Sequence, residues 1–487
     1  MKGTKLKVTQ VLDKYKKLSV QVKAAMWFAA CSILQKGVSF IVVPLFTRLL
    51  TTEQYGTYSL YLSWLQILTI ITSLYLYYGV FTNGMNNFDK DRDRYISSMQ
   101  GLTLTITGIV FLLFLVASST WSKMLELAPH LIFMMFIEMA VTPALSFWSG
   151  RQRFEYKYRR LVLVTLGKSI ANPILGLILV SCAEDKASAR ILSVVITEVV
   201  FCGSIMIIQF IKGKCWFDAK YWKFALGMAI PLLPHYLSGM ILNKGDQIMI
   251  SKMVSTSAVA FYSVAYNIGM LVQIFTNAIS NSFTPWIYQR IKTDKYEKIP
   301  ETINFLMLLV AAMALGLMLL SPELVLLFGS SGYASAAYVI PPVAASVFFI
   351  FLYNILSTPQ FYYEKTSFLM ASSILAAVIN LGLNYVFIKK FGYVAAGYTT
   401  LVCYVLYSIG HAIVSRRVMK KFMLGKTLFD YKCVIGLSIF VILAGIGCNF
   451  IFEYRVIRYG LIVVFAVLAF VKRDLLISNI VGLRKSK

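Results

Sequence analysis

The chain contains 487 residues, of which 58% are hydrophobic and 14% are charged, and its formal net charge is +26. A soluble domain of this size could not bury so much apolar surface, so the composition excludes an ordinary soluble protein. The strict alternation of apolar and polar residues that is typical of a membrane β-barrel is absent. We therefore predict an all-α polytopic membrane protein, because helices satisfy their own backbone hydrogen bonds within lipid.

Mostly apolar stretches recur along the whole chain. Each is long enough to cross about 30 Å of hydrocarbon as a helix. We predict about 14 transmembrane helices, with edges good to about three residues, at residues 25–47, 58–82, 100–118, 129–149, 161–182, 191–211, 226–250, 258–284, 303–320, 336–356, 367–388, 393–414, 432–452 and 458–475.

The cationic residues concentrate in every second gap between the predicted spans. About 35 of the 47 Lys and Arg residues lie in the N-terminal segment, the even-numbered gaps and the C-terminal segment. The positive-inside rule therefore predicts that both termini and the even-numbered gaps are cytoplasmic. Most of the net positive charge is accounted for by these cytoplasmic segments, and it also attracts anionic membrane lipids. The charge therefore does not require a nucleic-acid partner, and we expect none.

The sequence shows no motif for catalysis or metal binding. Residues 167–169 (GKS) resemble the end of a phosphate-binding loop, but position 162 is Val and the stretch lies within a predicted span. The three His residues are far apart and lack metal-ligand spacing. No gap between spans is long enough for a catalytic domain. We therefore expect a protein that is not an enzyme and that uses no metal or cofactor.

A faint internal repeat indicates two related halves. Residues 48–59 (RLLTTEQYGTYS) and 252–263 (KMVSTSAVAFYS) share a cation, two apolar residues, two hydroxyl residues and a closing Tyr-Ser. They lie six spans apart, so an axis along the membrane normal would relate the halves. We predict two six-helix lobes with a cleft between them, followed by two further helices. The expected segments are a cytoplasmic basic tail (1–24), an N-lobe (25–217), a C-lobe (218–417), and two helices with a cytoplasmic tail (418–487).

Ionisable residues inside the predicted spans are candidates for function, because charge within the bilayer is costly. These residues are the cations Lys36, Lys168 and Lys244 and the acids Glu138, Glu198 and Asp246. Lys168 could be neutralised by either glutamate. Lys244 could pair with Asp246 or reach the outer surface. Lys36 lies near the middle of its span, where we expect it to face a water-filled cavity.

The seventh predicted span is expected to be a broken helix. Pro231 and Pro234 remove two backbone donors within one turn. His235 and Asp246 are eleven residues apart, which would place them on nearly the same face if the helix continued. They could take part in proton coupling. The alternative is that His235 is simply hydrogen-bonded at a kink.

Two predicted spans carry amide side chains at a spacing of four residues. The eighth has Gln273, Asn277 and Asn281, and the eleventh has Asn380 and Asn384. Such stripes could join helices through hydrogen bonds or could bind hydroxyl groups in a cavity that accommodates sugars.

Aromatic residues gather around the second predicted span. These are Tyr55, Tyr58, Tyr61, Trp64, Tyr75, Tyr77 and Tyr78. Aromatic belts at the membrane interface would explain many of them, and stacking on sugar rings is the alternative.

Several motifs resemble those of a known family. Residues 44–59 (PLFTRLLTTEQYGTYS) are close to the pattern P-x-x-T-R-x-L-x-x-x-x-Y-G-x-Y, and residues 246–251 (DQIMIS) and 260–266 (AFYSVAY) give a second match. Weaker matches are 332–337 (GYASAA) and 391–398 (FGYVAAGY). With these motifs the chain resembles the polysaccharide-export flippases, the Wzx-type O-antigen group, of the multidrug/oligosaccharidyl-lipid/polysaccharide exporter superfamily.

The resemblance implies an alternating-access transporter in the bacterial cytoplasmic (inner) membrane. It would move an undecaprenyl-diphosphate-linked oligosaccharide, a repeat unit of O-antigen, capsule or exopolysaccharide, to the outer leaflet, in contact with membrane lipids and with glycan polymerase or export proteins. The expected cations for the diphosphate are Lys36, Arg48, Lys168 and Lys244. Arg48 could instead cap the C-terminal end of its helix. The amide stripes and Tyr residues could contact the glycan.

Four other functions compete with this interpretation. Lipid II flippases share the fold and chemistry. Multidrug exporters of the same superfamily usually have twelve spans and prefer cations. The basic residues within the spans and the two extra predicted spans argue against such an exporter. A membrane-bound polymerase or ligase would have a large outer loop, and no outer gap here exceeds about fifteen residues. A scaffold for glycan assembly would not need cations at membrane depth.

Overall fold

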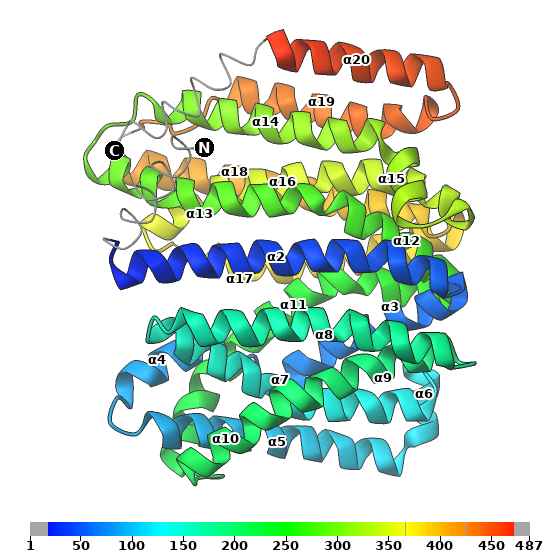
Figure 1. Cartoon of the computed structure of the whole chain (residues 1–487). Helices are drawn as coiled ribbons and strands as arrows, with labels where there is room; N and C mark the ends of the chain where they lie inside the picture. Colours follow the sequence, from blue (N-terminus) through cyan, green and yellow to red (C-terminus); the bar gives the residue numbers. More distant parts are fainter. Residues whose placement is uncertain (1–17, 366, 424, 472–487) are drawn as a thin grey trace, which may run out of the picture. The chain divides into compact units, whose positions relative to one another are not determined.

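The computed structural model describes residues 18–471 apart from 366 and 424 (Figure 1). These described residues form helices and connecting turns, without a β-strand. Among them, 12 helical segments are long and apolar enough to cross a membrane. The predicted all-α polytopic class is confirmed, and the predicted number of spans is approximate.

Two predicted spans are not among these segments. The helix α3 (Thr52–Ser73) carries Ser, Thr, Tyr and Gln residues that lower its hydropathy. The helix α20 (Arg455–Val471) has 17 residues, which is short for a span. The end of that predicted span, residues 472–475, lies outside the described residues, as does most of the predicted basic tail.

By its internal contacts the chain divides into two units, and the boundary between Ala260 and Phe261 lies within α12 (Thr256–Gly269). Unit 1 otherwise contains α2 (Val20–Leu49), α3, α4 (Gly79–Asn87), α5 (Arg92–Val116), α6 (Ser118–Leu125), α7 (Pro129–Phe154), α8 (Tyr158–Cys182), α9 (Lys186–Glu198), a π-helical turn (Val199–Gly203), α10 (Ser204–Gly213) and α11 (Ala219–Met253). The boundaries of the two six-helix lobes stay a prediction.

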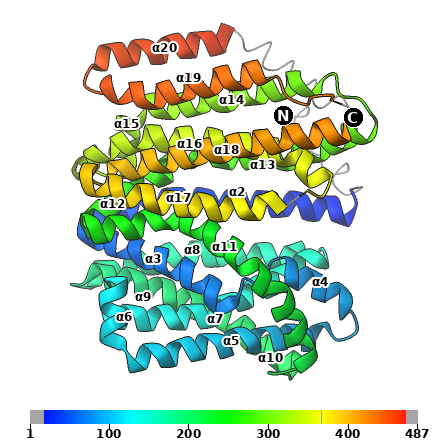
Figure 2. The same ribbon diagram turned by 180° about the vertical axis from the view of Figure 1, so that it is seen from behind.

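Unit 2 contains the rest of α12, then α13 (Leu271–Lys292), α14 (Ile299–Leu319), α15 (Ser321–Phe328), a 3₁₀ segment (Ser331–Val339), α16 (Ile340–Tyr362), α17 (Ser367–Phe391), α18 (Val394–Phe422), α19 (Tyr431–Phe450) and α20. Its centre is α16, which packs against α13, α14, α18 and α19 (Figure 2). Most residues of α16 are buried, as expected of a helix that is apolar on all faces.

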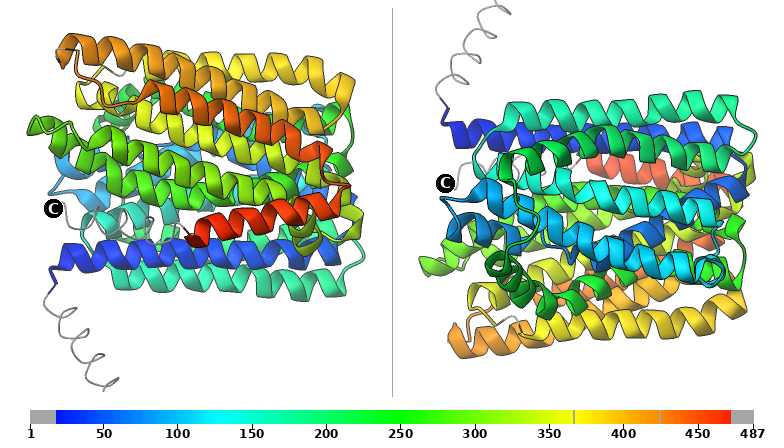
Figure 3. Two further views of the ribbon diagram at one scale, coloured as in Figure 1. Left: turned by 90° about the horizontal axis from the view of Figure 1, so that it is seen from above. Right: turned by 90° about the horizontal axis from the view of Figure 1, so that it is seen from below.

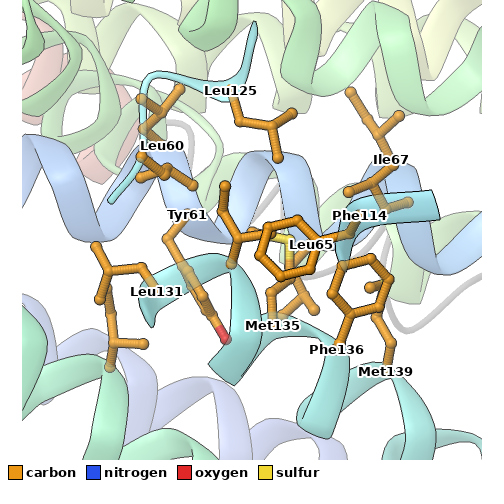
Figure 4. Close-up of a cluster of buried hydrophobic side chains, with 14 of the residues drawn as sticks. Leu60, Tyr61, Leu65, Ile67, Phe114, Leu125, Leu131, Met135, Phe136 and Met139 are labelled. Carbon is orange, nitrogen blue, oxygen red and sulfur yellow. The ribbon is translucent and has the colours of Figure 1, made fainter. Parts of the chain in front are cut away.

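The centre of unit 1 is α3, which packs against α5, α7, α9 and α11. One face of α3 joins an apolar cluster with residues of α5, α6 and α7, and Figure 4 shows its main members, which include Leu65, Phe114 and Met135. At the side of the unit, α2 and α8 run alongside each other (Figure 3). Several polar residues of α3, among them Ser59, Tyr61 and Ser63, are buried within the unit.

The start of α3 contains part of the internal repeat. A capping box opens the helix: Thr51 Oγ1 accepts from Gln54 N at 3.2 Å, and Gln54 Oε1 accepts from Thr51 N at 3.0 Å. Gly56 lies against the start of α12, where an added Cβ would collide with the carbonyl oxygen of Thr256. Thr52 and Ser257 also share a hydrogen bond of 3.4 Å. The two repeat segments thus contact each other.

Interruptions of the helices differ from those predicted. The prediction of a broken seventh span is wrong, because α11 continues as a helix through Pro231 and Pro234. A proline removes one backbone bond and can bend a helix, yet the flanking turns keep their bonds. Breaks occur instead in the second predicted span, at residues 74–78 between α3 and α4, and in the eighth, at Met270 between α12 and α13.

Candidate functional site

Unit 1 contains a group of polar side chains between α3, α7, α8 and α9, which we call the polar core. It consists of Tyr61, Glu138, Lys168, Glu198 and Cys202. Lys168 Nζ lies 2.6 Å from Glu198 Oε1, and Cys202 Sγ donates to Glu198 Oε2 at 2.9 Å. Tyr61 donates its hydroxyl to Glu138 Oε2 at 3.0 Å. Of the two glutamates that could neutralise Lys168, Glu198 is the one that pairs with it.

The π-helical turn helps to build the polar core. It follows directly after Glu198 and contains Cys202. The extra residue of a π-turn shifts the register of a helix, and such turns are frequent at functional sites. Here the thiol and the ammonium group both contact one carboxylate, which is largely buried, with 9% of its side chain exposed.

A second buried cation, Arg190 on α9, was not among the residues predicted from the sequence. Its side chain is 2% exposed, and its guanidinium lies over the Phe46 ring at 4.2 Å from the centroid. It donates to Asn172 Oδ1 at 2.9 Å and to Ser193 Oγ at 2.8 Å. Within the described residues it forms no ion pair, and its Nε has no hydrogen-bond partner. Arg190 lies at the edge of a predicted outer gap, so it was not counted among the residues within a span. The apolar residues that follow it could have indicated that it belongs to the membrane-spanning helix.

The predicted diphosphate cations lie on several elements of unit 1. Lys36 is exposed on α2, and Arg48 is exposed in the last turn of the same helix, where a cation interacts favourably with the helix dipole. Lys244 is half-buried on α11. Among the described residues, no salt bridge involves Lys36 or Lys244. The local pair of Lys244 with Asp246 does not form, because residues two apart on a helix point in different directions.

The continuous α11 places His235 and Asp246 on nearly the same face, three turns apart. His235 is half-buried and Asp246 is completely buried. Eleven residues at 1.5 Å each separate their backbones by about 16 Å along the helix. A proton could not pass directly between them over that distance, and a role in ion coupling stays a prediction for each residue separately.

The two amide stripes have different surroundings in unit 2. On α13, Gln273 is half-buried, whereas Asn277 and Asn281 are exposed. On α17, Asn380 and Asn384 are completely buried.

Hydrogen bonds hold the α17 pair against α18. Asn384 Nδ2 donates to Asn380 Oδ1 at 3.1 Å, and Asn380 Nδ2 donates to Thr400 Oγ1 at 3.4 Å. Thr399 donates its hydroxyl to Asn384 Oδ1. These bonds support the helix-joining alternative, so the prediction of glycan contacts is not kept for Asn380 and Asn384. Gln273, Asn277 and Asn281 stay candidates.

Two protein families match parts of the chain. The family described as polysaccharide biosynthesis protein matches residues 22–292, and the family described as MatE matches residues 231–386. The first match covers more than half of the chain.

Two curated proteins are similar to this chain in sequence. The "Lsg locus putative protein 1" of Haemophilus influenzae is 23% identical over 354 residues, which cover 71% of this chain and 85% of that protein. The "probable low-salt glycan biosynthesis flippase Agl15" of Haloferax volcanii is 22% identical over 220 residues, which cover 42% of this chain and 47% of that protein.

Solved structures of two kinds share the fold. The lipid II flippase MurJ, in an inward closed conformation, matches with a TM-score of 0.67 and 14% identity, covering 93% of this chain and 100% of that chain. A multidrug resistance MATE family transporter in an inward-facing conformation matches with a TM-score of 0.59 and 16% identity, covering 83% and 99% of the two chains. Because the first family match covers more than half of the chain, the chain belongs to the polysaccharide biosynthesis protein family.

Proposed function

We propose that this protein is a flippase that moves an undecaprenyl-diphosphate-linked oligosaccharide from the cytoplasmic to the outer leaflet of the bacterial inner membrane by alternating access. The oligosaccharide would be a repeat unit of O-antigen, capsule or exopolysaccharide. The family membership and the relative named as a glycan biosynthesis flippase support this proposal.

One observation carries the proposal: uncompensated positive charge on membrane-spanning helices. Lys36 on α2 and Lys244 on α11 have no acidic partner among the described residues. A cation at membrane depth is costly unless it meets an anion or water. A diphosphate carries negative charge and accepts charge-assisted hydrogen bonds from ammonium groups. A lipid-linked diphosphate therefore fits the charge of these helices, whereas a cationic drug does not.

In this proposal the protein moves its substrate without a chemical reaction. The lysines hold the diphosphate, the amides of α13 contact the glycan, and the lipid tail stays in the bilayer, because a sugar chain cannot enter hydrocarbon without losing its hydrogen bonds to water. Glycan polymerase or export proteins would receive the product. Both termini lie in the cytoplasm, in keeping with the distribution of Lys and Arg.

Deletion of the gene tests the proposal, with analysis of the lipid-linked intermediates and the surface glycans. We expect viable cells that lack one surface polysaccharide and accumulate undecaprenyl-linked oligosaccharide on the cytoplasmic side. Lethality with lysis would favour lipid II as the substrate. Unchanged glycans with greater sensitivity to cationic drugs would favour a drug exporter instead, a function for which the MatE family match provides a reason.

Substitution of Lys36 tests the charge argument. Lys36→Ala should abolish export of the glycan at normal protein levels, and Lys36→Arg should retain part of it, because the cation is kept. Lys123→Ala removes an exposed lysine of the short helix α6 and serves as the matched control. Export by Lys36→Ala at the wild-type rate would show that this cation does not hold the substrate.

A further inference from the structure

The break between α3 and α4 has an unusual backbone. Leu74 and Tyr75 have φ values of 47° and 52°, so two consecutive residues that are not glycine adopt the left-handed conformation. Side chains with a Cβ rarely adopt it, because the Cβ approaches the following carbonyl oxygen. Such strain persists only where the surrounding structure enforces it, and it is concentrated at functional sites.

The interior of unit 1 enforces this turn. Leu76 is completely buried, and Leu74, Val80 and Phe81 join it in an apolar cluster with residues of α5, α7 and α11. Backbone bonds close the turn: Leu76 N donates to Ser73 O at 3.1 Å, and Phe81 N donates to Leu76 O at 3.0 Å. With the leucines held inside, Tyr78 is exposed and Tyr75 is half-buried, whereas Tyr77 packs against the cluster.

Two tyrosines of the turn and one of α11 form one aromatic surface. We call it the tyrosine platform, and it consists of Tyr75, Tyr78 and Tyr236. The rings of Tyr75 and Tyr78 are stacked, with centroids 4.3 Å apart and planes at 18°. Tyr236, on α11, lies 4.9 Å from Tyr75 between centroids. Tyr78 is 52% exposed, so part of its ring is open. Tyr77 does not share this exposure, because it is half-buried and lies edge-on against Phe147.

An aromatic belt at the lipid interface does not account for this arrangement. Belt residues project from regular helices toward the head groups, whereas these rings come from a strained turn and a second helix and stack on one another. The turn also lies within an apolar stretch. Non-helical backbone within a membrane is tolerated only where protein buries it or where it borders water. Because Tyr78 and Gly79 are exposed, we infer that this part of the turn faces water and not hydrocarbon.

We propose that the tyrosine platform binds a sugar ring of the transported glycan by stacking. This inference rests on the proposed flippase function and adds a contact for the sugar part of the substrate. The C–H groups on one face of a pyranose meet the negative face of an aromatic ring favourably, and phenol hydroxyls can exchange hydrogen bonds with sugar hydroxyls. Stacking of this kind requires only one apolar face of a sugar ring. It can therefore bind several of the different sugars that a repeat unit contains.

Binding by the purified full-length protein in nanodiscs tests the platform. The two probes are a short-chain prenyl diphosphate that carries an N-acetylglucosamine disaccharide and the same prenyl diphosphate without sugar. We expect wild-type protein to bind the sugar-bearing probe more tightly. Tyr78→Ala should weaken binding of that probe by about three- to tenfold, as for the loss of one aromatic contact. Binding of the bare diphosphate should not change.

Two further variants separate stacking from folding. Tyr78→Phe keeps the ring and should bind within about twofold of wild type. Tyr385→Ala removes a similarly exposed tyrosine of α17 and should not alter binding.

The two hypotheses fail in different ways. Equal loss of both probes in Tyr78→Ala, or no loss of either, would overturn the sugar contact while leaving the diphosphate site intact in the wild type. Failure of wild-type protein to bind either probe would instead overturn the proposed function and this inference with it.

Discussion

The polar core of unit 1 and the buried amides of unit 2 both join membrane-spanning helices through side-chain bonds, but they differ in charge. In unit 1, Lys168 and Glu198 form an ion pair beside Glu138. In unit 2, Asn380 and Asn384 bond to each other and to hydroxyls of α18. Removing the partner of a neutral amide lowers the stability of the fold only slightly, whereas a charge left without a partner in a membrane interior lowers it strongly. The amides of α17 hold helices together without charge, while the polar core of unit 1 keeps charges that could respond to a substrate or an ion. Unit 2 also has a buried cation, Arg458, which pairs with Glu323.

The largest expected effect comes from breaking the ion pair. Lys168→Met leaves the carboxylate of Glu198 without its cation, and we expect a loss of about 3 kcal/mol in the free energy of unfolding. The double variant Lys168→Met/Glu198→Gln removes both charges and should recover at least half of that loss. Unfolding of detergent-solubilised protein measures both values. If the double variant were no more stable than the single one, then the pair would not be the source of the effect.

A smaller effect is expected from the amides of unit 2. Asn384→Ala removes the hydrogen bond to Asn380 within α17 and the hydrogen bond from Thr399 of α18. The free energy of unfolding should fall by about 1 kcal/mol. Export of the glycan should continue at the wild-type rate, because the amide is buried between α17 and α18. The same unfolding assay and a measurement of surface glycan check the two parts. Lost export in a stable Asn384→Ala protein would instead give this amide a role in transport and reduce the contrast between the two sites.

The smallest effect concerns a charged group of unit 1 that lies just beyond the end of α7. Burial raises the pKa of Glu155, but hydrogen bonds from Lys157 and Arg151 outweigh burial and hold the pKa below its ordinary value of 4.5. Arg151 Nε donates to Glu155 Oε1 at 2.8 Å. Because the pKa is lowered on folding, the ionised carboxylate stabilises the protein above pH 4.5, and this contribution disappears as the pH falls from there through the folded-state value.

Melting temperatures of the wild type and Glu155→Gln across this pH range show whether the stabilisation by Glu155 falls or rises as the pH is lowered. The wild type should melt at a higher temperature near neutral pH, and the difference should shrink below pH 4.5. A difference that grew on acidification would contradict the assigned interactions. Because this ion pair is partly exposed to solvent, its effect should be smaller than that of the polar core and should weaken in high salt.

The interruptions of the helices show where local signals fail. Pro231 and Pro234 are strong breakers, yet α11 continues through them. Residues 74–78 (LYLYY) contain neither proline nor glycine, yet the helix ends there, because the packing of Leu74 and Leu76 into the apolar cluster selects the turn. Helix propensity is a weak prior that tertiary contacts override.

The sequence by itself determined the fold class, most of the spans and the family, because the length of an apolar stretch and the residues of a motif are properties of the chain alone. Only the tertiary structure decided which face of each helix meets protein. The amides of α13 and α17 have the same spacing of four residues, but Asn277 is exposed and Asn384 is buried. Arg190 likewise became a buried cation only when Phe46 of another helix covered it. Periodicity fixes which residues share a face, whereas the neighbour of that face depends on the packing of helices distant in the sequence.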